Sequence, residues 1–196
     1  RSLVGSEMCI RDSALAEWGA DSVRCGIGGG SICSTRLVAG HGVPTLQNII
    51  DCARSHHDVK IIADGGIKKS GDIVKALAAG ADFVMVGSMF AGTTETPGQV
   101  FTSQSGKKYK VYRGMASKDA QTDWRGKSST PEGISTTVAF KGSVKHVLRD
   151  LAGGLKSGLS YTGARNLLEL RTKAQFIKQT NAGQTESSTH ILMRNK

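Results

Sequence analysis

The sequence Gly19-Ala20-Asp21-Ser22-Val23-Arg24-Cys25-Gly26 returns as Gly80-Ala81-Asp82-Phe83-Val84-Met85-Val86-Gly87. Each copy follows a helical pattern and leads into a short apolar strand that ends in glycine. A glycine before a strand is typical of a helix C-cap, and a glycine after it lets the backbone approach a ligand. The repeat therefore predicts two strands of the same kind, each ending in a loop suited to binding.

A third strand of this kind, Lys60-Ile61-Ile62-Ala63-Asp64-Gly65-Gly66, lies between the two copies. Helical patterns at 45–55 and 70–79 separate the strands, and the second has an apolar face. Alternating strands and helices predict parallel βαβ units, which form either an open doubly wound sheet or a closed barrel. Glycine-rich loops at the same end of several strands favour the barrel, whose last two strands often build a phosphate site.

Three strands cannot close a barrel. We therefore expect an α/β fold that is the C-terminal part of a (β/α)8 TIM barrel, incomplete in this chain and carrying an inserted flap. The chain is then a fragment of a longer protein. Residues 1–13 show no clear period and resemble the translated adapter leader of some environmental gene fragments, so we expect a non-native leader there.

The remaining residues divide into three segments. Residues 14–97 hold the partial barrel with its glycine loops. Residues 98–140 hold an alternating strand at 107–112 and a polar, mobile flap at 114–130. Residues 141–196 hold the final barrel helix at 141–158, which Gly153-Gly154 weakens, a short helix at 164–174, and a polar tail from Asn181 that is extended or anchored by a neighbour.

Composition excludes several classes of protein. The net charge of +10 is spread along the 196 residues without a dense basic run or interleaved aromatics, so we expect anionic, phosphate-bearing ligands and no nucleic acid. No apolar stretch is long enough for a membrane span, and no signal peptide is visible. The four cysteines have no framework spacing, which fits a reducing, cytoplasmic location.

Cys33 lies in Gly28-Gly29-Gly30-Ser31-Ile32-Cys33-Ser34-Thr35-Arg36, directly after an apolar run. Glycines leave space for a ligand beside the thiol, which attacks electrophilic carbon when its pKa is lowered or a base is near. Thr35 adds a hydroxyl nearby. A cysteine in such a loop can equally be structural, and the loop carbonyls could also hold a monovalent cation.

Two acidic residues are further candidates. Asp64 ends an apolar strand before two glycines, which suits binding of sugar hydroxyls with the Gly65 and Gly66 amides on a phosphate, although a turn or helix-cap aspartate has the same pattern. Glu132, in Pro131-Glu132-Gly133, follows the flap and could be a solvated loop carboxylate. The histidines show no metal-ligand spacing.

Together these motifs resemble the IMP dehydrogenase and GMP reductase family from about Ala14 to the C-terminus. Gly28 to Cys33 resembles the catalytic cysteine loop, and Ala63-Asp64-Gly65-Gly66-Ile67 with Val86-Gly87-Ser88 resembles the ribose and phosphate motifs. Tyr112-Arg113-Gly114-Met115-Ala116-Ser117 resembles the nucleotide-binding strand and the start of the flap, and Pro131-Glu132-Gly133-Ile134 also matches.

The resemblance implies roles for these residues. Cys33 attacks purine C2 and forms a covalent adduct, while Thr35 and Glu132 handle the proton of the incoming or leaving group. The nucleotide monophosphate is held at its phosphate and ribose by Ser31, Asp64, Gly65, Gly66, Gly87, Ser88 and Tyr112, and at its base by Gly114, Met115 and Ala116.

The resemblance also implies a cation and an assembly. Potassium would be held by carbonyls of Gly28, Gly30 and Cys33, completed by Glu186, Ser187 and Ser188 of a neighbouring subunit. The nicotinamide cofactor is NADPH in a reductase or NAD in a dehydrogenase. The family implies a homotetramer, and we expect the isolated chain to be inactive.

The flap separates the two activities. Dehydrogenases carry an Arg-Tyr dyad that activates water, whereas the segment between Met115 and Glu132 contains Trp124-Arg125-Gly126 and no Arg-Tyr. Cys33-Ser34-Thr35-Arg36 also resembles the reductase motif. We therefore favour NADPH-dependent reduction of GMP to IMP and ammonia. The segment from Tyr161 to His190 looks more like bacterial dehydrogenases, so oxidation of IMP to XMP with NAD stays open, as does a non-catalytic nucleotide-binding fragment.

Overall fold

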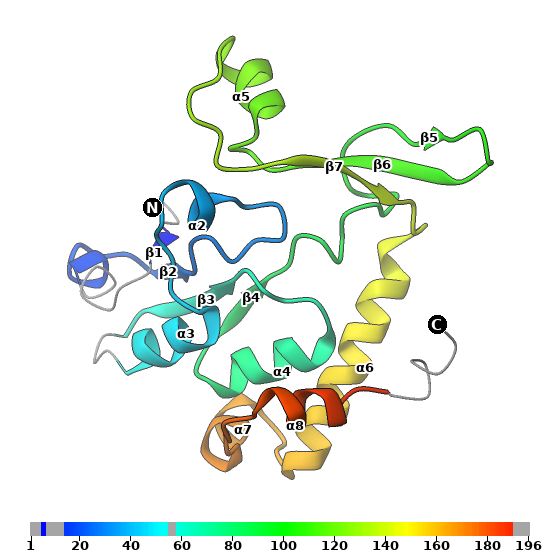
Figure 1. The fold of residues 1–196 in the computed structure, drawn as a ribbon. Coiled ribbons are helices and arrows are strands. Elements are labelled where there is room, and N and C mark those ends of the chain that lie inside the picture. The colour runs from blue at the N-terminus through cyan, green and yellow to red at the C-terminus, as the bar shows by residue number, and fades with distance from the viewer. Residues whose placement is uncertain (1–4, 7–13, 55–57, 190–196) are drawn as a thin grey trace.

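Two separate β-sheets organise the chain in the computed structural model, which describes residues 5–6, 14–54 and 58–189 (Figure 1). The first sheet is parallel, with the order β1-β2-β3-β4. The second is antiparallel, with the order β5-β6-β7. The strands are β1 Gly5–Ser6, β2 Ser22–Cys25, β3 Lys60–Asp64, β4 Phe83–Met85, β5 Phe101–Thr102, β6 Lys108–Arg113 and β7 Ser135–Ala139.

One face of the parallel sheet forms the core. Val23, Cys25, Ile61 and Ala63 alternate with more exposed residues along β2 and β3 and are buried against helices. The covering helices are α3 (Thr45–Ala53) and α4 (Ser70–Ala78), each of which turns a buried face toward the strands. Alternate residues of each strand point toward the helices, and one face of each helix points toward the strands, as βαβ units require. The predicted α/β fold with a parallel sheet is confirmed.

The opposite face of the same sheet is much less covered by the described residues. On β4 the side chain of Phe83 is 58% exposed and that of Met85 is 38% exposed. Their neighbours across the ladder are Ile62 and Asp64. A parallel sheet is normally buried on both faces, so this face is suited to packing against further structure.

Helix α6 (Val144–Thr162) packs along α4, and its glycines make this contact possible. A Cβ on Gly154 would lie 2.0 Å from the Ser70 hydroxyl oxygen, and one on Gly158 would lie 2.6 Å from a Val74 methyl. The helix continues past Gly153-Gly154 to Thr162, beyond the expected end at 158, and Gly154 lies at the contact with α4. The expectation that the two glycines weaken this helix stays a prediction.

The last helices close the helical side of the parallel sheet. Helix α7 (Leu167–Lys173) buries Leu170 completely. From the same helix Arg171 donates to the Ala81 carbonyl at 2.7 Å and pairs with Asp82 at 3.1 Å, which ties α7 to the turn before β4. The start of the tail, expected to be extended or anchored by a neighbour, forms helix α8 (Asn181–Glu186), whose N-cap is the Thr180 hydroxyl. Its anchoring by a neighbour stays a prediction.

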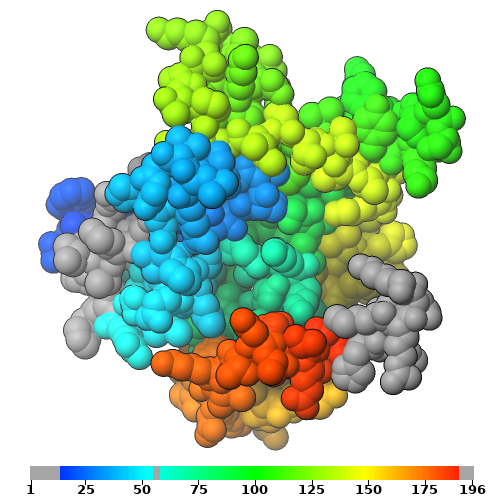
Figure 2. Space-filling model, viewed as in Figure 1, coloured from blue at the N-terminus to red at the C-terminus, as the bar shows by residue number. Residues whose placement is uncertain are grey.

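The flap also holds more regular structure than its polar sequence suggested. Helix α5 (Lys118–Arg125) begins at the Ser117 cap and ends at Gly126, which has a φ of +71°. Short helix α2 (Thr35–Val38) was not predicted, nor were β5 and β7. Figure 2 shows the α5 region and the β5–β6 hairpin projecting as two lobes from the body of the molecule.

The segment that the sequence analysis set aside as a leader contributes β1, which pairs with β2 in the parallel sheet. Residues 1–4 and 7–13 of that segment lie outside the described residues. Its non-native origin therefore stays a prediction. None of the helices in the described part of the chain is long and apolar enough to cross a membrane.

Candidate functional site

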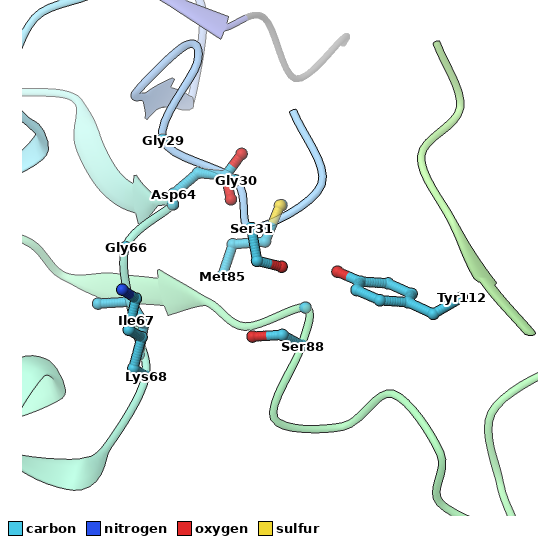
Figure 3. Close-up of a pocket in the computed structure, with 12 residues that line it drawn as sticks. Gly29, Gly30, Ser31, Asp64, Gly66, Ile67, Lys68, Met85, Ser88 and Tyr112 are labelled. Carbon is cyan, nitrogen blue, oxygen red and sulfur yellow. The ribbon is translucent and has the colours of Figure 1, made fainter. Parts of the chain in front are cut away.

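A pocket of about 120 Å³ opens where the strands of the parallel sheet end (Figure 3). Loops after β2, β3 and β4 form one side, and Tyr112 from β6 forms the other. Its lining residues are Gly29, Gly30, Ser31, Asp64, Gly65, Gly66, Ile67, Lys68, Met85, Gly87, Ser88 and Tyr112. The pocket therefore brings together the expected residues Ser31, Asp64, Gly65, Gly66, Gly87, Ser88 and Tyr112.

Glycine is required where the loops after β2 and β3 meet. Gly65 has a φ of +89°, and a Cβ there would lie 2.7 Å from the Gly29 carbonyl carbon. A Cβ on Gly26 would lie 2.1 Å from the Asp64 carbonyl oxygen. Both contacts are backbone against backbone, so a side chain at either position would push the loops apart.

Hydroxyl groups line this pocket from three separate elements. Figure 3 shows the oxygens of Ser31 and Tyr112 facing each other, while the Ser88 oxygen points toward the side of the pocket where Lys68 lies. The Tyr112 hydroxyl lies so close to Gly87 that a Cβ on Gly87 would be 2.9 Å from it. Hydroxyls and glycine backbone form a lining suited to phosphate oxygens.

Asp64 is paired rather than free at the pocket wall. Its carboxylate accepts a hydrogen bond from the Arg24 guanidinium, and both side chains are about one-quarter exposed. Sequence reasoning missed Arg24, although it precedes Gly26 on the neighbouring strand and alternation places it on the face that carries Asp64. The pair holds the carboxylate in a fixed orientation with one side still open to the pocket.

Cys33 lies beside this pocket with a hydroxyl partner. Its Sγ is 3.1 Å from Thr35 Oγ1, and the Cys33 N–H donates to the Gly30 carbonyl at 3.1 Å. Cys33 is half-buried, whereas a structural cysteine is usually enclosed among apolar side chains. The loop is therefore closed tightly around a thiol that keeps access to solvent.

The end of the flap is joined to the cysteine loop through backbone hydrogen bonds. The Ser34 N–H donates to the Glu132 carbonyl at 2.9 Å, and the Ile134 N–H donates to the Ile32 carbonyl at 3.0 Å. Gly133 forms a β-bridge with Cys33. The backbone of Glu132, from a distant part of the chain, is therefore joined to the loop that carries the other two expected catalytic residues, Cys33 and Thr35.

The start of the flap is joined to the same segment. The Glu132 N–H donates to the Ala116 carbonyl at 3.1 Å, and the Gly114 N–H donates to the Ile134 carbonyl at 3.2 Å. Met115 between them is 75% exposed. The expected base-contacting segment Gly114 to Ala116 is thus brought beside the cysteine loop, with Met115 still open to solvent.

The expected cation ligands are only partly brought together. Gly28, Gly30 and Cys33 share the cysteine loop, but Glu186, Ser187 and Ser188 end α8 at the opposite side of the molecule (Figure 1). Within the described residues, no group of three or more His, Cys, Asp or Glu side chains could hold a metal. A cation at this loop would depend on carbonyl oxygens.

The model of the IMP dehydrogenase / GMP reductase domain matches residues 7–190. The chain belongs to this family. Inosine-5′-monophosphate dehydrogenase of Aquifex aeolicus is 51% identical over 188 residues, which cover 90% of this chain and 38% of that protein. GMP reductase of Leishmania major is 46% identical over 192 residues, which cover 92% of this chain and 39% of that protein.

A solved structure of the family has the same fold. It is a cysteine-to-alanine variant of GMP reductase from Trypanosoma brucei in complex with guanosine 5′-monophosphate. The TM-score is 0.89 at 45% identity, covering 94% of this chain and 39% of that one. The chain thus spans about two-fifths of the length of these family members, which are named as purine nucleotide oxidoreductases of both kinds.

Proposed function

We propose that the protein containing this chain reduces GMP to IMP and ammonia with NADPH, through a covalent adduct on Cys33. The observation that carries the proposal is that the loop of Cys33 and Thr35 is joined to the Glu132 backbone beside a pocket lined for phosphate. Ser31, Gly66, Gly87, Ser88 and Tyr112 hold the 5′-phosphate, Asp64 the ribose hydroxyls, and Met115 and Ala116 the base.

The reaction divides into two changes at purine C2. The Cys33 thiolate adds to C2, and the bond from C2 to the amino nitrogen breaks as Thr35 and Glu132 deliver a proton, so that ammonia leaves. NADPH, when bound, supplies the hydride that C2 receives. The carbon–sulfur bond then breaks, which restores the thiolate and releases IMP. GMP, NADPH and a proton thereby give IMP, NADP⁺ and ammonia.

The flap favours loss of ammonia over hydrolysis. Arg113, directly before the flap, pairs with Asp123, and Arg125 within the flap lies 4.7 Å from the centre of the Trp124 ring. Neither is followed by a tyrosine, so the flap lacks the Arg-Tyr pair that would activate water for a dehydrogenase. Reduction of GMP does not need such a pair.

Oxidation of IMP to XMP with NAD is the second candidate. It is supported by the relatives named inosine-5′-monophosphate dehydrogenase that are 51% identical to this chain. Both candidates use the same cysteine and the same nucleotide pocket. They differ in the direction of hydride transfer and in whether ammonia or water takes part.

We also propose a potassium ion at the cysteine loop. Carbonyl oxygens of Gly28, Gly30 and Cys33 are neutral ligands of the kind that potassium accepts. The Gly30 oxygen receives the Cys33 N–H and keeps a second lone pair for a cation, so the loop fits the ion. Glu186, Ser187 and Ser188 of a second copy would complete the shell, since the α8 segment is largely exposed on this chain.

The exposed face of the parallel sheet bears on the whole fold. We propose that the parallel sheet is part of a (β/α)8 barrel, because helices cover one face while Phe83 and Met85 on the other face are left for further strands and side chains. A homotetramer is proposed with it because the family resemblance implies one, and a potassium site that draws residues from two subunits requires an oligomer.

The test uses the full-length protein. Absorbance of NADPH should fall when GMP is added, with ammonia released in equal amount. Formation of NADH from IMP and NAD, together with no turnover of GMP, would assign the dehydrogenase instead. No turnover with either pair, while GMP still binds, would favour a non-catalytic nucleotide-binding protein.

A further inference from the structure

The two sides of the phosphate pocket belong to different sheets. Gly87 and Ser88 follow β4 of the parallel sheet, whereas Tyr112 lies on β6 of the antiparallel sheet. A pocket that binds phosphate needs these groups at a fixed separation, because hydrogen bonds form over a narrow range of donor–acceptor distances, about 2.5 to 3.2 Å. The contacts that hold β6 and β7 against the segment after β4 therefore decide the shape of the pocket.

Lys141 directly follows the β7 ladder and contacts the Ser88 loop. Its Nζ donates to the Ser88 carbonyl at 3.0 Å and to the Met89 carbonyl at 3.1 Å. Its backbone N–H donates to the Gly92 carbonyl at 2.8 Å, and the Thr94 N–H returns a bond to Gly142. One residue thus joins the antiparallel sheet to the loop that carries a pocket hydroxyl.

Lys110, on β6 with Tyr112, makes a second connection to the segment after β4. Its side chain is buried, with 2% of the residue exposed. The ammonium donates to the Thr93 carbonyl at 3.0 Å and to the Thr96 carbonyl, and it also reaches the Thr96 hydroxyl. A buried charge is costly unless such acceptors surround it, so these bonds hold the Thr93–Thr96 turn firmly against β6.

We propose that Lys110 and Lys141 are positioning residues that fix the Gly87–Ser88 loop opposite Tyr112 and so preorganise the pocket for a phosphate. Lys141 also places a positive charge on the carbonyl of Ser88, next to the space where the dianion binds. The inference rests on the proposed function for the identity of the phosphate-bearing ligand. The attachment of the segment after β4 to the antiparallel sheet depends only on the hydrogen bonds of the two lysines.

The first test compares a nucleotide with its nucleoside in the full-length protein. Calorimetry of GMP and guanosine binding should show that Lys141→Met weakens GMP binding about tenfold and leaves guanosine binding unchanged. Lys141→Arg, which keeps the charge and the donors, should restore most of the GMP affinity. Lys156→Met, which removes an exposed lysine from α6, is the matched control and should change neither affinity.

Equal losses for GMP and guanosine, or no loss for either, would overturn the positioning role of Lys141. Lys110 is buried, so its variant is read by a measurement that needs no ligand. Amide hydrogen exchange over residues 87–96 should become faster in Lys110→Met and in Lys141→Met, with exchange in β2 and β3 unchanged. Unchanged exchange over residues 87–96 in both variants would refute this attachment.

The two proposals fail in different ways. If the unaltered protein binds GMP no more tightly than guanosine, the phosphate pocket and the proposed function are wrong. Hydrogen exchange still decides in that case whether the lysines hold the loop. If GMP binds more tightly than guanosine and Lys141→Met preserves the whole difference, only the positioning role is wrong.

Discussion

In the parallel half of the molecule, glycine backbones pack directly against one another at the site, whereas the antiparallel half is attached by backbone hydrogen bonds and by the long side chains of Lys110 and Lys141. Gly26 and Gly65 let the loops after β2 and β3 touch with no side chain between them. Tyr112, Met115 and Glu132 are instead brought to the site by β6, β7 and the flap.

This difference separates two tasks. We expect the parallel half to be the rigid surface against which a nucleotide phosphate and ribose are held. Under the proposed function, the antiparallel half and its flap would carry the groups that decide the fate of a Cys33 adduct. Variants in the flap should therefore change chemistry first, and variants in the glycine loops should change stability first.

Outside Cys33 itself, the largest effect is expected at Glu132. Glu132→Gln removes the carboxylate of a residue whose backbone is hydrogen-bonded to the cysteine loop. It should lower kcat for GMP reduction about a hundredfold or more, with little change in GMP affinity, because the proposed proton-handling group is lost. Steady-state kinetics and calorimetry on the full-length protein measure both quantities. Asp123→Asn, a flap carboxylate that pairs with Arg113, is the control. An unchanged kcat in Glu132→Gln would remove this residue from the mechanism.

A comparison of two glycines tests the rigidity of the parallel half. Gly65→Ala should lower the free energy of unfolding by at least about 2 kcal/mol, because φ is +89° and the new methyl group would strike the Gly29 backbone. Gly106→Ala, with a φ of +78° and open space around it, should cost only about 1 kcal/mol. Urea unfolding measures both, and equal losses would contradict the close contact of the two loops.

The parallel half of the site could be predicted from the sequence. The strands β2, β3 and β4 and the loops after them were predictable because alternation and glycine position are local signals. The residues Ser31, Asp64, Gly66 and Ser88 follow from those strands, since parallel strands end at the same edge of a sheet. The structure places all four in one pocket.

The rest depends on contacts between distant segments. Helix α5 has a polar sequence with a Ser117 cap, which looks like a loop until its buried residues Ala120 and Gln121 are known. Gly154 looks like a helix breaker until the approach of α6 to α4 is seen. Lys110 and Lys141 carry no motif at all, because their partners are backbone carbonyls after β4.

Tyr112 tests how the two halves meet at the pocket. Tyr112→Phe removes one hydroxyl from the lining and should weaken GMP binding about fivefold without changing guanosine binding. Tyr109→Phe, on the same strand but stacked on Phe101, is the control and should leave both affinities unchanged. A loss of guanosine affinity in Tyr112→Phe would show instead that β6 contacts the base or ribose.

The smallest effect is expected at Glu95, which joins the turn after β4 to α6. Hydrogen bonds from the Val144 N–H and the Ser143 hydroxyl hold the pKa of Glu95 below its ordinary value of 4.5. A lowered pKa contributes stability above the ordinary value that is lost as pH falls through the lowered one. Glu95→Gln should therefore flatten the fall in Tm as the pH is lowered below 4.5. An unchanged slope would contradict this role for the carboxylate.

The central claim is that Cys33 forms the bond to purine C2, and Cys33→Ala in the full-length protein tests it most directly. NADPH oxidation with GMP should fall at least about a thousandfold, while calorimetry should still detect GMP binding, because the pocket residues remain in place. Turnover of GMP within about tenfold of the unaltered protein would contradict the account.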